Sequence, residues 1–328
     1  MHPVSKLALQ ILFYPLKTLL GHLSQVPYYV PDESHLLSYS MLTRYRDSPA
    51  KPLPAKRPRS LTLLLPPKES HSSSAAVQKT DEQTQSLLFA KLPMEIRTMI
   101  YGMALSGEGQ LLHIVRVSPH SISHLRCSKA DGGQCRYYEC FDFYEEDGEK
   151  LSARKRTHGN LLPLTLSCRK VYTEAISTLY SHNTFEFRDL YSLICFPSTI
   201  LPTRMNQIRS LKLDCIVGAG HRNFGRTDVT PQNDVPWKMV WKIIAGMTEL
   251  RDLRVDLAML RDSPSLSAEQ EIQLLAPLMA VRQAKGFVVN LRWSAQLSYD
   301  DGAGELRDRA FELVHTGPGS HRHDSLDG

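Results

Sequence analysis

Histidine and cysteine side chains gather between residues 120 and 140, and they are the residues of this sequence best suited to metal chemistry. The five candidates are His120, His124, Cys127, Cys135 and Cys140. Thiolate and imidazole are ligands that zinc prefers, and a small loop-rich segment is strongly stabilised by a bound metal. The segment has no Cys-x2-Cys pair, the usual knuckle of a structural zinc site. Two interpretations stay open: a zinc-stapled or metal-dependent domain, and thiols in a surface loop with no cofactor.

Elsewhere the sequence shows almost no pattern that is typical of an enzyme. It contains no Gly-x-Ser-x-Gly elbow, no phosphate-binding glycine loop followed by Lys-Ser/Thr, and no His-Glu-x-x-His. The stretch "SCRK" at 167–170 matches Ser-x-x-Lys, but the Ser-Asp-Asn and Lys-Thr-Gly elements that accompany it in serine enzymes are missing. We therefore expect a protein that is not an enzyme.

The formal charge of +5 comes from the N-terminal part of the chain. Residues 1–91 hold 11 Lys and Arg against 6 Asp and Glu, whereas the remaining residues are balanced at 28 and 28. A neutral body argues against a nucleic-acid partner, because nucleic-acid-binding domains carry clustered cations for phosphate contact. Within the basic part, Lys56, Arg57 and Arg59 of "PAKRPRS" are similar to a short nuclear-import signal. A solvated linker is the alternative.

The N-terminal segment "KLALQILFYPLKTLLGHL" (6–23) is apolar but is interrupted by Pro15 and Lys17. It is shorter than the roughly 20 apolar residues that cross a bilayer, and it lacks the features of a cleavable presequence. We predict no transmembrane segment, and either an amphipathic helix on a membrane or a docked or frayed helix. Six cysteines are too sparse for a disulfide scaffold. We therefore expect an intracellular protein, cytoplasmic or nuclear.

The first strongly patterned segment is "LPMEIRTMIYGMAL" (92–105). It predicts a helix that begins at Pro93, because proline suits the first helical position and Glu95 favours the positive end of the helix dipole. One apolar stripe follows the helix, made of Leu92, Ile96, Ile100 and Met103. A helix this short is marginal alone, so the stripe must pack against another element.

The predicted partner is an amphipathic helix within "LLPLTLSCRKVYTEAISTLYSHNTFEF" (161–187). Its apolar positions recur at helical spacing: Leu164, Cys168, Val171, Tyr172, Ala175 and Leu179. Asn160 is suited to cap its N-terminus. The β-prone "TFEF" then predicts a strand.

These two segments together resemble an F-box. "LPMEIRTMIYGMAL" resembles its first helix, whose pattern begins Leu-Pro-x-Glu-(Leu/Ile), and "LTLSCRKVYTEA" resembles its later part, where Cys-Arg precedes an aromatic residue. The arrangement over residues 85–215 is similar to a large fungal family of uncharacterised F-box-like proteins, in which an insertion separates the two halves and Ser/Asn-Thr-Phe-x-Phe follows. The sequence departs from a compact F-box in the long insertion, 106–160, and in Tyr172 at the position of the usual Trp.

The resemblance implies an adaptor role, in which an F-box docks the small Skp-type subunit of a cullin ubiquitin ligase and the remaining domain holds a protein client. Carried over to this sequence, the partner-binding residues are Leu92, Pro93, Ile96, Ile100, Leu166, Cys168, Arg169 and Val171. The alternative is that both helices pack on each other and on the body as a core, which leaves a scaffold that binds no adaptor.

Strand and helix patterns alternate along the rest of the chain. "QLLHIVRVS" in the insertion reads as a strand, as do "IRSLKLDCIV", "LRDLRVDLAM" and "GFVVNLRW". Helices are predicted at 189–201, 235–247 and 269–284. The Leu-x-Leu strands resemble curved leucine-rich arrays, and a small open sheet with helices on one side is an equally good interpretation.

We therefore predict an α+β fold: F-box-like helices followed by irregular α/β repeats that form a small sheet with helices on one side, or a leucine-rich-repeat-like array. The predicted organisation is an N-terminal helix within 1–30, a disordered Pro- and Ser-rich linker at 31–86, an F-box-like domain at 87–187, a repeat-like region at 188–315 and a disordered tail at 316–328.

Overall fold

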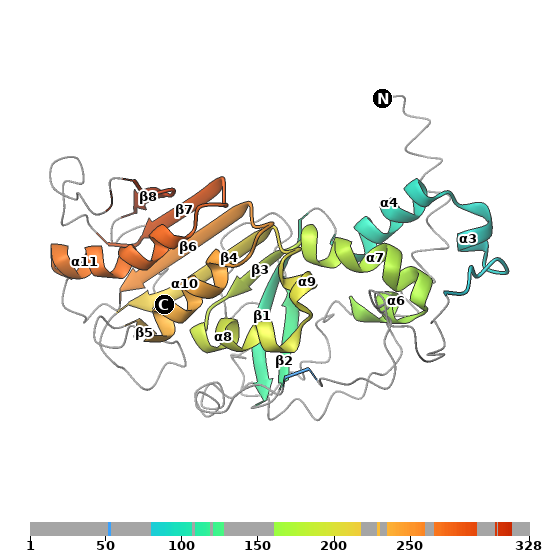
Figure 1. Ribbon diagram of the computed structural model, residues 1–328, viewed down its shortest axis with the longest axis horizontal. Coiled ribbons are helices and arrows are strands. Elements are labelled where there is room, and N and C mark those ends of the chain that lie inside the picture. Colours follow the sequence, from blue (N-terminus) through green and yellow to red (C-terminus); the bar gives the residue numbers. More distant parts are fainter. Residues whose placement is uncertain are drawn as a thin grey trace, which may run out of the picture.

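The computed structural model describes residues 52–53, 80–106, 109–118, 121–127, 161–217, 228–229, 235–259, 266–293, 306 and 308–316. This part of the chain has the predicted α+β class, with helices beside a mostly parallel sheet (Figure 1). No helix within these residues is long and apolar enough to cross a membrane. Their four cysteines form no disulfide bond.

The described helices are α3 (Leu87–Lys91), α4 (Met94–Leu105), α6 (Leu162–Leu166), α7 (Arg169–Ser181), α8 (Leu190–Thr199), α9 (Pro202–Met205), α10 (Val235–Ala245), α11 (Ala268–Leu275) and the 3-10 helix η3 (Ala276–Ala280). The described strands are β1 (Leu111–Ser118), β2 (Ser121–Arg126), β3 (Thr184–Phe187), β4 (Ser210–Val217), β5 (Asp228–Val229), β6 (Asp252–Met259), β7 (Gly286–Leu291) and β8 (Glu312–His315).

The strands form one sheet in the order β2-β1-β3-β4-β6-β7-β8, and β5 pairs with β4. β1 and β2 form an antiparallel pair, and every other pairing is parallel. From β1 onward the order in the sheet follows the order in the chain. Right-handed crossovers that always step in the same direction place their helices on the same face of the sheet. The short β5 is the exception, because it pairs with β4 at Ile216 and Val217, where β4 is also paired with β6 on its other edge.

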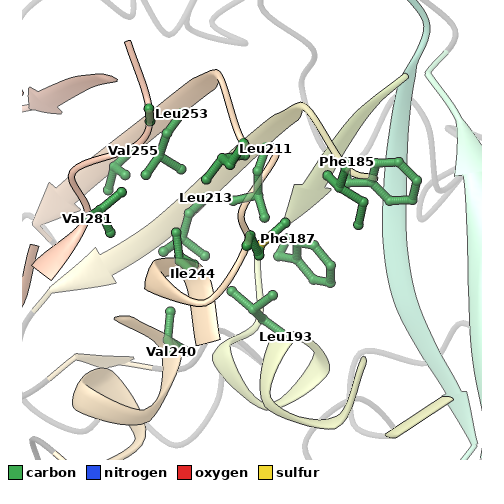
Figure 2. Close-up of a cluster of buried hydrophobic side chains, with 14 of the residues drawn as sticks. Phe185, Phe187, Leu193, Leu211, Leu213, Val240, Ile244, Leu253, Val255 and Val281 are labelled. Atoms are coloured by element: carbon green, nitrogen blue, oxygen red, sulfur yellow. The ribbon is translucent and has the colours of Figure 1, made fainter. Parts of the chain in front are cut away.

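One face of the sheet carries the hydrophobic core (Figure 2). Leu211 and Leu213 of β4 and Val255 of β6 point toward Val240 and Ile244 of α10. All five side chains are buried. Burial of a side chain of this size stabilises the fold by roughly 1.5 to 3 kcal/mol, so this face holds the helix layer on the sheet.

Aromatic side chains also fill this layer, beside β3 and on α10. Phe187 of β3 meets Phe196 of α8 edge to face, with ring centroids 5.3 Å apart. Trp237 and Trp241 of α10 make a similar contact at 5.2 Å. Aromatic pairs prefer these tilted geometries, which bring the positive edge of one ring to the negative face of the other.

A helical lobe, which we define as α3, α4, α6 and α7, lies at one end of the sheet (Figure 1). α4 and α6 both pack on α7, and α7 leads directly into β3. The single sheet runs across the boundary predicted at residue 187, because β3 pairs with β1 on one side and β4 on the other. The lobe and the sheet are therefore connected through the hydrophobic core that they share.

The single helix predicted within 161–187 is wrong, because the chain forms two helices there, α6 and α7. Cys168 between them has extended backbone angles, φ −158° and ψ 164°, and its sulfur accepts a hydrogen bond from the Val171 N–H at 3.5 Å. This side-chain bond satisfies an N–H that has no partner within the helix, so a new helix begins at Arg169. Asn160, the predicted cap, lies outside the described residues.

The other predicted elements agree closely with the structure. The strand-like segments correspond to β1, β3, β4, β6 and β7, and the three later helices to α8, α10 and α11 with η3. Pro93 is the cap of α4, one residue before the helix begins, with φ −65° and ψ 162°.

Candidate functional site

A charged network fixes α4 on α7 within the helical lobe. The Arg97 guanidinium donates to the Glu174 carboxylate from Nε to Oε2 at 2.9 Å and from Nη2 to Oε1 at 2.8 Å. The Tyr101 hydroxyl donates to the same Oε2 at 3.0 Å, and Arg97 Nη1 donates to the Leu92 carbonyl at 2.6 Å. Burial and the Glu174 carboxylate raise the pKa of Tyr101, which keeps its hydroxyl protonated as a donor. This network turns the Arg97 and Tyr101 side of α4 inward.

The outward side of α4 carries exposed methionines together with the exposed Glu95 and Thr98. We define the α4 face as Met94, Glu95, Thr98, Met99, Gly102 and Met103, which share this side of the helix. Met99 and Met103 are one turn apart, and their exposed fractions are 52% and 55%. Leu87 of α3 and Leu162 and Leu166 of α6 are also exposed in the same lobe. Methionine is flexible and polarizable, and it is over-used at surfaces that bind partner proteins.

Gly102 occupies the middle of the α4 face. A Cβ added to Gly102 would meet no described atom within 4 Å. Glycine in a helix interior is less stable than alanine by roughly 0.5 to 1 kcal/mol. Packing among the described residues therefore does not require a glycine at position 102. A partner whose backbone approaches α4 closely at this point would require one.

The eight residues that the F-box resemblance suggests for partner binding are divided between core and surface. Ile100 and Val171 are buried; Leu92, Ile96, Cys168 and Arg169 are half-buried; Pro93 and Leu166 are exposed.

The apolar stripe predicted on α4 is divided in the same way. Ile100 enters the core at 5% exposure, but Met103 points outward. The expectation that Met103 packs inside the chain is therefore wrong, because Arg97 and Tyr101 determine the orientation of α4.

The metal candidates are only partly described. His124 is half-buried in β2, and Cys127 is buried just after that strand, where its N–H donates to the Leu111 carbonyl at 2.9 Å. Among the described residues, no three His, Cys, Asp or Glu side chains gather as a metal site would require. The remaining candidates, His120, Cys135 and Cys140, lie outside the described residues, so zinc binding stays a prediction. The import-like Lys56, Arg57 and Arg59 also lie outside them.

The face of the sheet opposite the core carries charged side chains that sequence reasoning missed. Glu186 of β3 lies in register with His113 of β1 and Lys212 of β4. His113 Nδ1–H donates to Glu186 Oε2, and Lys212 Nζ lies 2.9 Å from Glu186 Oε1. Arg188 Nη2 lies 3.3 Å from the same Oε1. One buried carboxylate therefore has basic partners from both neighbouring strands.

A second buried carboxylate continues the network across the sheet. Asp256 Oδ1 of β6 accepts a hydrogen bond from Asn290 Nδ2 of β7 at 2.6 Å. Lys212 Nζ lies 3.6 Å from Asp256 Oδ2, so this lysine links the two carboxylates. Arg254 Nε lies 3.4 Å and Arg292 Nη2 4.0 Å from Asp256 oxygens. We call these charged and polar residues the charged row: His113, Glu186, Arg188, Lys212, Asp214, Arg254, Asp256, Asn290 and Arg292.

The acids of the charged row are more deeply buried than Arg254 and Arg292. The side chains of Glu186 and Asp256 are 0% and 3% exposed, whereas those of Arg254 and Arg292 are 62% and 30% exposed. Burial alone would raise the pKa of Glu186, but the His113 hydrogen bond and the charges of Arg188 and Lys212 lower it well below its ordinary range. Glu186 is therefore ionised, and both buried carboxylates lie beneath the more exposed side chains of Arg254 and Arg292.

A signal for the charged row is present in the sequence. β4 contains "LKLD" and β6 contains "LRVD", and the paired residues are in register. Strands of a parallel sheet that is covered on both faces are apolar almost throughout. Charges at alternate positions of neighbouring parallel strands therefore predict that helices do not cover one face of the sheet. The Leu-x-Leu interpretation considered only the apolar positions and did not use the charged residues between them.

The chain matches a family model described as "Domain of unknown function (DUF7730)" over residues 81–310. The match begins before α3 and ends just before β8, so it includes both the helical lobe and the charged row. The comparisons with curated proteins and with solved structures found no match. Because the family model spans well over half of the 328 residues, the chain belongs to the family defined by the domain of unknown function DUF7730.

Proposed function

We propose that this protein is a non-enzymatic protein–protein interaction module whose α4 face docks a partner protein. The observation that carries the proposal is the exposed pair Met99 and Met103 beside Gly102. An exposed apolar cluster is a typical sign of a partner site. A glycine without an internal packing role at its centre supports close contact with a partner backbone.

The partner that we propose is the small Skp-type subunit of a cullin ubiquitin ligase. This step is supported by the F-box resemblance of 92–105 and 161–187 and by the exposure of Pro93 and Leu166, two of the residues that the resemblance suggests for docking. In this role the protein is a fungal F-box-like substrate receptor, and the body that carries the sheet holds a protein client.

The rigidity of α4 is consistent with this role. Its bidentate ion pair with Glu174 fixes the rotation of the helix, so the methionines are presented outward before any partner arrives. A pre-organised surface loses less conformational entropy on binding than a mobile one. Docking at α4 also leaves the charged row available, because those residues lie on the sheet rather than in the lobe.

The direct test is capture of a purified fungal Skp-type adaptor by the full-length protein and by a Met99→Asp/Met103→Asp variant. Both substitutions replace exposed side chains, so the variant is expected to fold. The matched control is Met239→Asp, which places an acid at an exposed methionine of α10. Capture by the wild type and the control, with loss in the double variant, is the expected result. No capture by the wild type, or equal capture by all three, contradicts the proposal.

A further inference from the structure

We propose that Met99 and Met103 form a reversible oxidation site. Conversion of both thioethers to sulfoxides by a peroxide replaces the two most exposed apolar side chains of α4 with polar ones. This inference rests on the proposed function, because it assigns a form of regulation to the surface that we expect to dock the adaptor. The chemistry of the site itself requires no adaptor and can be tested without one.

A peroxide in solution can reach both side chains. Met99 and Met103 are 52% and 55% exposed, and their positions one turn apart place them side by side on one surface of the helix. Met205 and Met247, by contrast, are 7% and 0% exposed. A buried methionine meets a dissolved oxidant only when the structure opens locally. The oxidant should therefore react with the pair on α4 well before it reaches these two.

Hydrogen bonding to sulfur separates the pair from the neighbouring Met94. The Arg97 guanidinium donates from Nη2 to Met94 Sδ at 3.3 Å, so a cation engages a lone pair of that sulfur. Across the part of the chain that the structure describes, the sulfurs of Met99 and Met103 accept no such bond. The sulfur is the nucleophile in this oxidation and becomes more positive as it reacts, so a bound guanidinium opposes the reaction. Met94 should therefore react more slowly than the pair, although it is 44% exposed.

The reaction is a two-electron oxidation of each sulfur. A sulfur lone pair attacks one oxygen of hydrogen peroxide, the O–O bond breaks, and the sulfur–oxygen bond of the sulfoxide forms. The second oxygen leaves as water, after solvent has carried a proton to it from the first. The sulfur loses two electrons and the peroxide gains them. Methionine sulfoxide reductases, which take their electrons from thiols, restore the thioether with one enzyme for each epimer, so the modification is reversible.

The other side chains of the α4 face have no donor to offer the sulfoxide oxygens. The Thr98 hydroxyl already donates to the Met94 carbonyl at 2.9 Å. The Glu95 carboxylate offers only acceptors, and Gly102 has no side chain. A partner that covers the α4 face would therefore remove both sulfoxides from water without a hydrogen bond from this helix. Because an unpaired buried acceptor is costly, oxidation should weaken docking.

The first measurement is an oxidation map of the folded full-length protein. Hydrogen peroxide is added at a limiting dose, and peptide mapping by mass spectrometry follows sulfoxide formation at each methionine with time. Met99 and Met103 should oxidise at least roughly tenfold faster than Met205 and Met247, and reductases for both epimers should return them to methionine. Rates for the pair that equal those of the buried methionines, or sulfoxides that the reductases do not reduce in the folded protein, would overturn the inference.

Met239 on α10 provides a matched comparison for the role of the sulfur. It is 46% exposed, nearly the same as Met94 at 44%, but no hydrogen bond from the described residues reaches its sulfur. Met239 should therefore oxidise faster than Met94 in the same map. Oxidation of Met94 at the rate of Met239 would contradict protection by Arg97, and with it the selection of one methionine pair within α4.

The second measurement compares capture of a purified fungal Skp-type adaptor by the reduced and the oxidised protein. The test variant is Met99→Leu/Met103→Leu, which keeps apolar side chains of similar size and removes both sulfurs. The matched control is Met239→Leu on α10. Oxidation should weaken capture by the wild type and the control at least roughly tenfold and leave capture by the double variant unchanged.

Equal weakening of all three proteins, or no weakening of any, would overturn regulation at this pair. Absence of capture by the reduced wild type is a different result. It would contradict the proposed function, whereas the oxidation map would still decide whether Met99 and Met103 form an oxidation site.

Discussion

The guanidinium of Arg97 on α4 and the carboxylate of Glu174 on α7 form two parallel hydrogen bonds, at 2.9 and 2.8 Å. This pair joins the two F-box-like segments, 92–105 and 161–187, which the insertion 106–160 separates in the sequence. It determines the rotation of α4, and therefore which side chains of that helix reach the surface. The shape of the proposed docking surface depends on a partly buried charge pair rather than on the apolar stripe.

Removal of the Glu174 charge is expected to loosen α4. Glu174→Gln should lower the free energy of unfolding by about 1 to 3 kcal/mol, because Arg97 and the Tyr101 hydroxyl keep their positions but lose an ionised acceptor. Urea denaturation measures this change, with the exposed Glu95→Gln as the matched control. An unfolding free energy equal to that of the control would show that the pair does not hold the helix.

Substitution of Gly102 separates stability from binding. Gly102→Ala should raise the free energy of unfolding by roughly 0.5 to 1 kcal/mol, because alanine favours the helix and its Cβ meets open space. The same methyl group should weaken adaptor binding, because it blocks close approach at the centre of the α4 face. Thermal unfolding and titration calorimetry measure the two effects. A variant that is more stable and binds the adaptor as well as the wild type would remove the role that we assign to this glycine.

The charged row should make stability depend on pH through Glu186. Its pKa is lowered in the folded protein, so the carboxylate stabilises the fold above its ordinary value of 4.5 and this contribution is lost as the pH falls toward the folded pKa. Glu186→Gln should therefore be less stable than wild type at pH 7 by about 3 kcal/mol, since it leaves buried basic groups without their acid. The difference should shrink in acid. Denaturation curves of both proteins, measured from pH 7 into acid, test the prediction. A difference in unfolding free energy that does not change with pH would refute it.

Glu271 of α11 should have the opposite pH dependence. This side chain is buried and accepts a hydrogen bond from the Trp293 indole N–H at 3.3 Å, and burial raises its pKa. A raised pKa means that the folded state loses stability as the pH rises through that value and the carboxylate ionises. The stability of Glu271→Gln relative to the wild type should therefore increase as the pH increases from 4 to 8. Melting temperatures of the two proteins that run parallel over this range would be the contrary result.

Much of the fold could be predicted from local sequence patterns. β4, β6 and β7 were predictable because alternate apolar residues line the core, and α10 because its apolar residues recur at helical spacing. The division between α6 and α7 was not predictable in this way. The apolar spacing continues through Cys168, while the extended backbone there depends on a local hydrogen bond to Val171.

The candidate site could be predicted less well than the fold. Leu92, Ile96 and Ile100 have the spacing of a stripe, but the buried position of Arg97 depends on Glu174, far away in the sequence. No local pattern contains that pairing. The charged row could have been found from "LKLD" and "LRVD", but its layering depends on the register between strands and on burial. Both are properties of the assembled sheet.

Hydrogen–deuterium exchange with and without a fungal Skp-type adaptor tests most directly that α4 docks a partner. We predict slower exchange in peptides from Met94–Leu105 when the adaptor is bound, and unchanged exchange in β4 and β6. Unchanged exchange throughout α4 at saturating adaptor, or protection limited to the sheet, would contradict the proposed function.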